Sequence, residues 1–319
     1  MIVVPDDFPS VFEGSAAHDR AQALGTVRVH TGRGADAEDE LARRIGSAKI
    51  AINIRAHARF SDAVLQACPE LRMISTRGTG TDNIDLAAAA RRGVVVCNTA
   101  GVNAIAVAEH AIALMLAVAR KIPAVDREMR SGAWPRETLV QLHGKTLGVF
   151  GAGAIGAHVA RLGRAFGMMV LAWSARGDTA RLEAMGLTPA SKQDILRRAD
   201  FISLHLRLTP ATRGFIGRGE FAATQPGAIL VNTGRGQLID REALIETLAA
   251  GRIAGAGLDV FHDEPIRPDD PLLDLATTVL SPHHAGQTAE VRRDGLLRTI
   301  ENIANFLNGS PTNVVSSPS

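Results

Sequence analysis

The sequence is poor in cysteine. Only Cys68 and Cys97 occur in 319 residues, which argues against a disulfide framework and for a reducing compartment. Two cysteines without a histidine cluster do not supply the ligands of a structural zinc site. No metal is therefore expected in this protein.

Strong net charge and long apolar runs are also missing. The formal net charge is +2 and no block of lysine and arginine stands out, so neither nucleic acid nor a membrane surface is expected as a partner. No apolar stretch reaches the roughly 18 uncharged residues of a membrane-spanning helix. The beginning of the chain, Met1–Asp7, lacks the basic flank and the long apolar core of a signal peptide. These absences predict a soluble cytoplasmic protein.

What is present is typical of a globular protein. Apolar residues make up 46% of the chain and charged residues 21%, without a bias toward disorder. A length of 319 residues is sufficient for two domains with a large buried core.

The most informative stretch is a glycine cluster between two apolar runs. Leu147–Phe150 leads into a G-x-G-x-x-G pattern that begins at Gly151. Ala157–Phe166 then has apolar residues at helical spacing, and Met168–Trp173 has the composition of a second buried strand. A strand, a glycine turn, a helix and a second strand form the context in which this pattern predicts a dinucleotide site.

Each glycine of the pattern has a physical role in such a site. Gly151 allows the tight turn, Gly153 lets the backbone approach a pyrophosphate, and Gly156 lets the helix pack closely on the strand. Free N–H groups at the start of the helix bind the phosphates. The alternative is an ordinary glycine turn that binds no ligand.

The end of the second strand departs from the usual NAD pattern. An acidic residue about 20 positions after the glycines normally binds the ribose hydroxyls. Here Ser174 occupies that position, and Arg176 follows it. A neutral hydroxyl and a guanidinium favour NADP over NAD, because nothing repels the additional phosphate and an arginine can pair with it. The alternative is a solvated arginine beside a permissive site that accepts either cofactor.

Strands and helices alternate along most of the chain, which predicts an α/β fold with parallel sheets covered by helices on both faces. The predicted strands are Ile2–Val4, Ile50–Ile54, Met73–Ser75, Val94–Cys97, Leu147–Phe150, Met168–Trp173, Phe201–Leu204, Ala228–Asn232, Gly257–Val260 and Thr278–Leu280. The predicted helices are Ala37–Ile45, Ser61–Ala67, Leu86–Arg91, Ala104–Arg120, Ala157–Phe166 and Glu290–Leu307. Residues 308–319 have the composition of a mobile tail.

Three charged side chains follow three different strands. Arg235, Glu264 and His283 each come shortly after a predicted strand. Ligands of open parallel sheets bind at the carboxyl ends of the strands, so these residues are expected to converge beside the nucleotide. His110, within the apolar helix 104–120, and His205 are expected to form structural hydrogen bonds.

Taken together, the motifs resemble those of the D-isomer-specific 2-hydroxyacid dehydrogenases, the family of phosphoglycerate dehydrogenase and hydroxypyruvate/glyoxylate reductase. Besides the glycine turn, the matching segments are Arg-Gly-Thr-Gly-Thr-Asp-Asn-Ile-Asp (77–85), Val-Ala-Glu-His-Ala (107–111), Val-Asn-Thr-Gly-Arg-Gly (231–236), Gly-Leu-Asp-Val-Phe-x-x-Glu-Pro (257–265) and Ser-Pro-His (281–283).

The resemblance implies a Rossmann cofactor domain, residues 99–284, inserted into a flavodoxin-like catalytic domain formed by residues 1–98 and 285–319. The active-site cleft would lie between the two domains. A homodimer would form through the long helix near residues 104–120.

The resemblance also implies roles for individual residues. Arg235 would bind the substrate carboxylate, for which its planar guanidinium is suited. His283 would donate a proton to the carbonyl oxygen during reduction, and Glu264 would orient its ring and favour the imidazolium form. Backbone N–H groups of Gly78, Thr79 and Gly80 would bind the carboxylate from the other domain, and Arg55 is a candidate for an acidic or phosphorylated tail. The expected cofactor-binding residues are Gly151, Gly153, Ala154, Ile155, Gly156, Ser174, Arg176, Leu206, Arg207, Thr233, Gly234, Asp259 and Gly286.

The sequence departs from the family pattern at two places. His205-Leu206-Arg207 has an arginine where the family often has proline, and Arg207 is a second candidate cation for a 2′-phosphate. His284 and Ala285 follow His283 where the family more often has a small residue and two glycines. The family match assigns proton transfer to His283, and His284 is expected to be packed or solvated. The chain ends near 319 without the regulatory domain of some phosphoglycerate dehydrogenases, so serine feedback through such a domain is not expected.

Three interpretations of function remain. The first is an NAD(P)-dependent oxidoreductase that interconverts a 2-oxoacid and a D-2-hydroxyacid, with glyoxylate, hydroxypyruvate, phosphohydroxypyruvate and larger 2-oxoacids as candidate substrates. The second is an NAD(H)-sensing scaffold of the corepressor type, and the third is a methyltransferase that uses S-adenosylmethionine. A methyltransferase has no use for Arg235, Glu264 and His283 together, and partner binding usually needs additional surface or tails. The oxidoreductase is therefore favoured.

Overall fold

The structure is a computed structural model that describes residues 1–55 and 57–316. The chain forms two compact units. Unit 1 contains Met1–Asn103 and Gln287–Ser319, and unit 2 contains Ala104–Gly286. Unit 2 is thus inserted between the two segments of unit 1. The division into a catalytic and a cofactor domain, with limits at 98/99 and 284/285, was predicted on functional grounds and stays a prediction.

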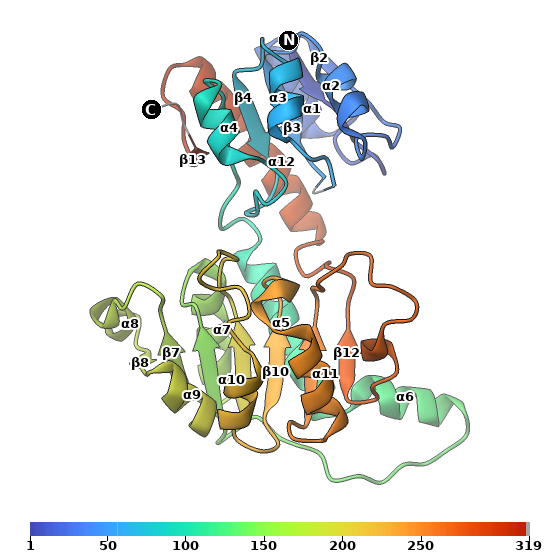
Figure 1. Ribbon diagram of the computed structural model, residues 1–319, viewed down its shortest axis with the longest axis vertical. Coiled ribbons are helices and arrows are strands. Elements are labelled where there is room, and N and C mark those ends of the chain that lie inside the picture. The colour runs from blue at the N-terminus through green and yellow to red at the C-terminus, as the bar shows by residue number, and fades with distance from the viewer. Residues whose placement is uncertain (56, 317–319) are drawn as a thin grey trace. The chain divides into compact units, whose positions relative to one another are not determined.

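Unit 1 is built on a six-stranded sheet in the order β13-β5-β4-β3-β1-β2 (Figure 1). Its strands are β1 Ile2–Val4, β2 Val27–Val29, β3 Ile50–Asn53, β4 Met73–Thr76, β5 Val95–Cys97 and β13 Val314–Ser316. The strands β1 to β5 pair in parallel, and their order, 2-1-3-4-5, is that of flavodoxin-like folds.

Helices cover both faces of this sheet. They are α1 Ala16–Leu24, α2 Glu38–Ile45, α3 Asp62–Ala67, α4 Leu86–Arg91 and α12 Ala289–Leu307. Side chains of α2, α3 and α4 contribute to one buried apolar cluster, and side chains of α1 and α12 contribute to the other. Ser61 and Asp85 cap the starts of α3 and α4 through their side-chain oxygens, which satisfies backbone N–H groups that lack a helical partner.

The end of the chain differs from the prediction of a mobile tail. Strand β13 pairs antiparallel with β5, with Val314 opposite Cys97 and Ser316 opposite Val96. Strand β5 would otherwise be an open edge of the sheet, and an edge offers unpaired backbone groups to a β-branched segment such as Val314–Val315. The tail prediction is therefore wrong for residues 314–316, and residues 317–319 lie outside the described part of the chain.

Unit 2 is built on a seven-stranded, wholly parallel sheet in the order β12-β11-β10-β9-β6-β7-β8. Its strands are β6 Thr146–Phe150, β7 Met169–Trp173, β8 Thr188–Pro189, β9 Phe201–Leu204, β10 Ile229–Asn232, β11 Gly255–Leu258 and β12 Thr278–Leu280. Counted within the unit, the order is 7-6-5-4-1-2-3, which contains the Rossmann order 3-2-1-4-5-6.

The helices of unit 2 lie on both faces of its sheet, with α9, α10 and α11 on one face and α5 and α7 on the other (Figure 1). They are α5 Ala104–Ala119, α6 Ile122–Arg130, α7 Ala154–Ala165, α8 Thr179–Ala184, α9 Lys192–Arg198, α10 Arg218–Ala223 and α11 Arg241–Ala249. Two short 3₁₀ turns complete the unit, Gly236–Leu238 and Pro271–Leu273.

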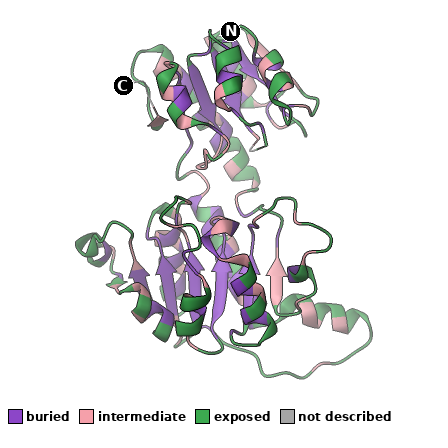
Figure 2. Ribbon diagram, viewed as in Figure 1, coloured by how far each residue is buried: buried purple, intermediate pink, exposed green. Residues whose placement is uncertain are grey.

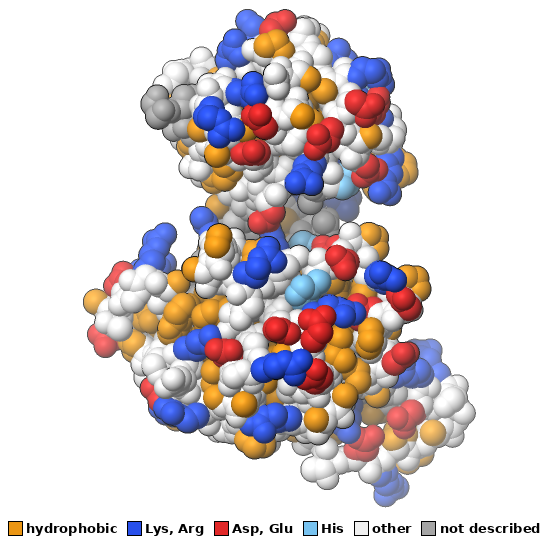
Figure 3. Space-filling model, in the orientation of Figure 1, with side chains coloured by type: hydrophobic (Ala, Val, Ile, Leu, Met, Phe, Trp, Pro, Cys, Tyr) orange, Lys and Arg blue, Asp and Glu red, His pale blue; other side chains and the backbone are white. Residues whose placement is uncertain are grey.

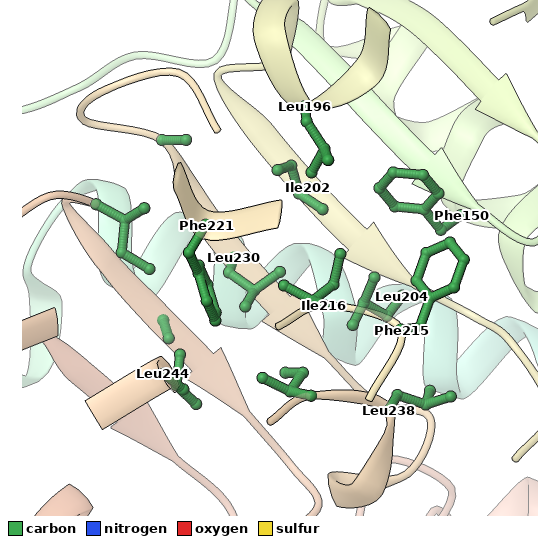
Figure 4. Close-up of a cluster of buried hydrophobic side chains, with 14 of the residues drawn as sticks. Phe150, Leu196, Ile202, Leu204, Phe215, Ile216, Phe221, Leu230, Leu238 and Leu244 are labelled. Carbon is green, nitrogen blue, oxygen red and sulfur yellow. The ribbon is translucent and has the colours of Figure 1, made fainter. Parts of the chain in front are cut away.

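Each face of the unit 2 sheet has its own buried apolar cluster. Figure 4 shows part of the cluster under α9 to α11, where Phe150 lies edge-on to Phe215 with ring centroids 5.1 Å apart. The other cluster contains the buried face of α5, which includes Leu114 and Met115. Figure 2 shows that the central strands are buried, that β12 at one edge is only partly buried, and that the outer helix faces are exposed. The packing of α5 inside its own unit accounts for its apolar sequence.

The predicted α/β fold class is confirmed, with two parallel-dominated sheets and one unit inserted into the other. One strand is displaced from its prediction, because β11 occupies Gly255–Leu258 and not Gly257–Val260. Several elements were not predicted, namely α1, β2, α6, α8, β8, α9, α10 and α11. Within residues 1–55 and 57–316, no helix combines the length and apolarity needed to cross a membrane.

Candidate active site

The glycine turn lies where the strand order of unit 2 reverses. Strand β6 pairs with β7 on one side and with β9 on the other, and ligands of doubly wound sheets bind at this position. Gly151 has a φ of 99°, and a Cβ atom on it would lie 2.6 Å from the backbone oxygen of His205. A Cβ on Gly156 would lie 2.0 Å from the oxygen of Gly151. Both positions therefore require glycine, for conformation and for close packing.

Gly153 differs from its two neighbours in the motif. A Cβ atom on Gly153 would have no described heavy atom within 4 Å, so the backbone there faces open space. Gly153 is the N-cap of α7 and provides no side-chain cap, so the first N–H groups of the helix, those of Ala154, Ile155 and Gly156, are available to an anion. Open space above uncapped N–H groups fits a dinucleotide pyrophosphate.

A pocket of about 340 Å³ opens beside the end of β7. Trp173, Ser174 and Thr179 contribute to its lining. The Ser174 hydroxyl accepts a hydrogen bond from the N–H of Arg176 at 3.3 Å. Among the residues that the structure describes, no ion pair engages the exposed guanidinium of Arg176. The pocket thus combines an apolar floor, a hydroxyl and a nearby cation.

The side chain of Asn232, at the end of β10, stabilises the turn that follows this strand. Asn232 accepts from the N–H of Gly234 at 3.0 Å and donates to the backbone oxygen of Arg235 at 2.8 Å. The hydroxyl of Thr233 is buried and has no hydrogen-bond partner among the described residues. A buried, unsatisfied hydroxyl is costly in a protein interior, so this group fits a ligand that supplies the missing partner.

Glu264 and His283, which are 19 positions apart in the chain, form the hydrogen-bonded pair that the family resemblance implied. The Nδ1 atom of His283 lies 2.6 Å from Oε2 of Glu264, while Oε1 of Glu264 accepts from the N–H of Phe261 at 3.0 Å. Burial by itself would raise the pKa of Glu264, but these hydrogen bonds and the positive charges of His283 and Arg235 lower it overall. Glu264 is therefore an anion at neutral pH, and it fixes the orientation of the His283 ring.

Arg235 belongs to the same group of side chains. Its charge contributes to the lowered pKa of Glu264, which places the two groups within electrostatic range. Its Nη1 atom donates to the backbone oxygen of Gly234 at 2.8 Å. The structure thus brings together, at the carboxyl ends of β10, β11 and β12, the three side chains that were predicted to converge.

Asp259, directly after β11, is buried with 1% of its surface exposed. Its Oδ1 atom accepts from the Ser281 hydroxyl at 2.6 Å and from the N–H of His284 at 3.0 Å. Its Oδ2 atom accepts from the N–H of Ala285 at 3.0 Å. Each carboxylate oxygen has about two lone-pair sites, so Oδ2 retains capacity for a further donor such as a carboxamide.

Asp259, His110 and His284 each have a ligand atom within 4.8 Å of the others, which is close enough for a divalent cation. However, Oδ1 of Asp259 already accepts two hydrogen bonds, and a metal ion would have to displace them. His205 contacts Ser203 through Nε2 at 2.8 Å, and burial lowers the pKa of His205 to about 4. His205 is thus a neutral structural residue, as predicted.

In unit 1, the loop after β4 carries the predicted carboxylate donors. The N–H of Gly78 already donates to the Thr99 hydroxyl at 2.7 Å. The N–H groups of Thr79 and Gly80 make no hydrogen bond to described residues, so they are the donors that a ligand would find open. Gly78 has a φ of 116°, which explains the need for glycine at that position.

Arginines gather near this loop. One Nη atom of Arg55 donates to the backbone oxygen of Pro9, and the Nε atoms of Arg55 and Arg77 are buried without a partner among the described residues. Burial lowers the pKa of both side chains, and the charge of Arg292 lowers both further, while the charges of Asp7 and Asp6 act in the opposite direction on Arg55. Arg55, Arg77 and Arg292 therefore share one region of unit 1, where they repel one another.

The comparisons with known proteins agree with the motifs. Residues 112–285 match the family model described as D-isomer specific 2-hydroxyacid dehydrogenase, NAD binding domain. The chain belongs to this family. A glyoxylate reductase of Aeropyrum pernix is 41% identical over 268 residues, covering 81% of this chain and 80% of that protein.

A D-3-phosphoglycerate dehydrogenase of Archaeoglobus fulgidus is also 41% identical, over 296 residues that cover 92% of this chain but 55% of that protein. The chain thus spans about half the length of the phosphoglycerate dehydrogenases that it matches. Among solved structures, an acyclic imino acid reductase in complex with NADPH and D-Arg superposes with a TM-score of 0.90. It is 29% identical, and the match covers 98% of this chain and 99% of that one.

Three residues that stand out in the structure were not assigned a role from the sequence. Arg77 directly follows β4 and precedes Gly78, so its position at a strand end was a usable signal. Arg292 lies on α12, more than 200 positions away in the chain, and no pattern links it to Arg55. Ser281 was named only as part of the Ser-Pro-His segment, whereas it connects Asp259 to His110.

Proposed function

We propose that the protein is an NAD(P)-dependent oxidoreductase that interconverts a 2-oxoacid and a D-2-hydroxyacid. The observation that carries the proposal is the pairing of Glu264 with His283 at 2.6 Å, beside Arg235, in the unit that contains the glycine turn. An imidazole held by a carboxylate is suited to move a proton, and an arginine is suited to bind a carboxylate.

The roles of the residues follow from their chemistry. The nicotinamide supplies or accepts the hydride when it is bound. His283 donates a proton from its Nε2 atom to the carbonyl oxygen of the 2-oxoacid, or accepts it in the reverse direction, while Glu264 holds Nδ1 and the ring orientation. Arg235 binds the substrate carboxylate and polarises the adjacent carbonyl group.

For the cofactor, we propose the glycine turn and the start of α7 as the pyrophosphate site. Oδ2 of Asp259 would accept from the nicotinamide carboxamide, and Thr233 would hydrogen-bond at the same face. Leu206, Gly234 and Gly286 would line the site. Each of these groups lies at the carboxyl end of the unit 2 sheet, which supports the assignment.

NADP is proposed in preference to NAD. Ser174 and the Arg176 guanidinium stand beside the pocket at the end of β7, where an acidic residue would repel a 2′-phosphate. Arg207, which is exposed after β9, is a second candidate cation. The NADPH of the imino acid reductase complex is consistent with this preference, although the family model is described by NAD.

The substrate is proposed to carry a second anionic group. Thr79 and Gly80 would donate their N–H groups to the substrate carboxylate, and Gly78 would do so on exchanging its bond with Thr99. Arg55, with Arg77 and Arg292 in the same region, would bind a carboxylate or phosphate at the other end. Three mutually repelling arginines gain more from a dianion than from a monoanion.

We also propose a homodimer. Exposed apolar side chains lie at Ile105, at the start of α5, and separately on α6 and the segment that follows it. Figure 1 shows that α6 and this segment extend away from the body of unit 2. The exposed side chains include Ile122, Met129 and Trp134, of which Trp134 is 74% exposed. An apolar surface of this kind is typical of subunit contacts, and light scattering after size exclusion tests it directly.

The function is tested by following the oxidation of NADPH and NADH with a panel of 2-oxoacids that includes mono- and dianions. Wild-type turnover that falls by about 10²- to 10⁴-fold in His283→Ala supports the oxidoreductase and its proton donor. His143→Ala is the matched control, because His143 is an exposed histidine of the same unit that lies outside the proposed site. Tight cofactor binding without turnover of any 2-oxoacid would reject the enzyme and favour an NAD(H)-sensing scaffold.

A further inference from the structure

The loop that carries His283 makes four of its hydrogen bonds to Asp259. Besides the three bonds that its carboxylate accepts, the backbone oxygen of Asp259 accepts from the N–H of His283 at 2.8 Å. His283 itself has a φ of 50°, a left-handed conformation that few non-glycine residues of the described chain adopt. Such a conformation is unfavourable for a residue with a side chain and persists only where surrounding contacts enforce it.

One side chain of this arrangement, that of His110, comes from helix α5 and not from the loop. His110 lies in the middle of α5, a helix that is otherwise mostly apolar. Its Nε2 atom is 2.8 Å from the Ser281 hydroxyl oxygen and 3.5 Å from Oδ1 of Asp259. The ring of His284 lies edge-on to it, with centroids 5.3 Å apart. Neither the proposed proton transfer nor the proposed cofactor contacts use His110.

The hydrogen-bond chemistry determines which nitrogen of His110 carries a proton. Burial alone would raise the pKa of Asp259, but the hydrogen bonds from His110, Ser281 and the loop lower it overall, so the carboxylate is ionised and can only accept. The Ser281 hydroxyl must therefore donate to Asp259 across the 2.6 Å contact. Its oxygen is then left to accept, and the Nε2 atom of His110 must be the donor.

We propose that His110 is a positioning residue for the proton donor. Its Nε2–H donates to Ser281, which donates to Asp259. This chain of bonds keeps Asp259 in the position from which its backbone oxygen accepts from His283 and stabilises the left-handed conformation of that residue. Because every bond in the chain has one orientation, the loop has a single favoured geometry. This inference rests on the proposed function only for its effect on turnover, since the hydrogen-bond chain itself is independent of any substrate.

The first test compares His110→Leu with His110→Gln. Leucine fills the space without a donor, whereas the glutamine amide can place an N–H near the position of Nε2. We expect kcat for reduction to fall by about 10- to 100-fold in His110→Leu, the range typical for partners that orient a site residue from behind. The KM for the 2-oxoacid should change little, and His110→Gln should recover most of kcat. Thermal unfolding of both variants verifies that they fold.

A double-variant cycle identifies the path. Ser281→Ala should cause a loss similar to that of His110→Leu, and the combined variant should lose no more than either alone, because both remove the same chain of bonds. Losses that multiply, or equal losses in His110→Leu and His110→Gln, would reduce His110 to a packing residue and overturn the proposal.

A spectroscopic test separates this inference from the proposed function. In protein labelled with ¹⁵N-histidine, long-range ¹⁵N–¹H correlations should show a proton on Nε2 of His110, and the Nε2 signal should shift in Ser281→Ala. A proton on Nδ1 with a bare Nε2 would overturn the proposal. This measurement needs no turnover, so it remains decisive even if no 2-oxoacid proves to be a substrate.

Discussion

The two units of this protein share an architecture but carry different side chains in the loops that follow their strands. Both are parallel sheets in which glycine-rich loops expose backbone N–H groups after a strand, at Gly78–Gly80 in unit 1 and at Gly151–Gly156 in unit 2. The loops of unit 2 additionally carry the Glu264 carboxylate, which is hydrogen-bonded to the His283 imidazole, and the ionised Asp259, which is hydrogen-bonded to Ser281. The loops of unit 1 present cations, Arg55 and Arg77, with unsatisfied Nε atoms.

The difference has a simple electrostatic meaning. Proton transfer needs paired groups whose orientation is fixed, and unit 2 provides them through short hydrogen bonds. Binding an anion needs positive charge and open donors, and the buried Nε atoms of Arg55 and Arg77 are proposed to supply them, with the charges of Asp6 and Asp7 offsetting part of the charge of Arg55. Under the proposed function, the same fold type would serve chemistry in one unit and recognition in the other, depending on which side chains follow its strands. On the face drawn in Figure 3, basic and acidic side chains are otherwise mixed, without a block of one sign.

The largest effect is expected from the packing of the glycine turn in unit 2. In Gly156→Ala the new Cβ would meet the Gly151 oxygen at 2.0 Å, which forces helix α7 away from β6. We expect a loss of about 3 kcal/mol in the free energy of unfolding and loss of NADPH binding. Thermal or denaturant unfolding and a fluorescence titration with NADPH measure the two effects.

Gly153→Ala is the matched control for this prediction. Its Cβ would enter open space, so its free energy of unfolding should fall by only about 1 kcal/mol or less, the cost of alanine in place of glycine at an N-cap. Its affinity for NADPH should nevertheless fall, because the methyl group occupies the space proposed for the pyrophosphate. If Gly153→Ala bound NADPH normally, the pyrophosphate would have to lie elsewhere.

The second prediction tests the acid-base pair. Glu264→Gln removes the negative charge beside Nδ1 of His283, so the protonated form of the ring loses its counter-ion. We expect kcat for reduction to fall by about 10- to 100-fold, and the alkaline limb of the pH profile to move to lower pH. Steady-state rates between pH 5 and 9 measure both changes.

On the acid side of the same pH profile, the protonation of Glu264 determines where the pair with His283 is lost. Because that pKa lies below its ordinary value of 4.5, Glu264 keeps its charge, and its hold on His283, down to pH values below 4.5. Asp263→Asn, a substitution of the exposed neighbour, should leave the profile unchanged. An unchanged profile in Glu264→Gln would show that the pair does not set the protonation of the active site.

Much of this arrangement was accessible from sequence because it follows local rules. The glycine turn, its flanking strands and the strand-end positions of Arg235, Glu264 and His283 are all encoded within a few residues of one another. Helix starts at Ser61 and Asp85 were visible for the same reason. Strand β11 was displaced by two residues because Val260 and Phe261 continue its apolar run, although the strand has ended before Asp259.

The rest depended on contacts between distant segments. Strand β13 forms only because β5 offers it an edge, and its short sequence carries no signal of its own. Helix α1 has few large apolar residues, since its buried side chains are Ala17 and Ala21. The bond from His110 to Ser281 joins residues 171 positions apart, and no local pattern could have shown that these two side chains meet.

The third prediction concerns the cations of unit 1. Arg55→Ala should raise the KM for a dianionic 2-oxoacid by about 10-fold, the loss of one charge-assisted hydrogen bond, and should leave kcat nearly unchanged. The KM for glyoxylate, a monoanion without a second acidic group, should change little. Arg59→Ala, which removes an exposed cation a few residues away, is the control. Equal effects on both substrates would assign Arg55 to the shared carboxylate or to the fold.

The smallest effect is expected at the edge of the cofactor pocket. Arg176 is exposed, so solvent screens its attraction for a 2′-phosphate, and surface pairs contribute little. We expect Arg176→Ala to lower the ratio of kcat/KM with NADPH to that with NADH by about 5-fold, while Arg198→Ala, an exposed arginine on α9, leaves it unchanged. A wild type that prefers NADH, with a ratio unaffected by Arg176→Ala, would show that Ser174 permits either cofactor and that recognition by unit 2 depends on its backbone and not on its surface cations.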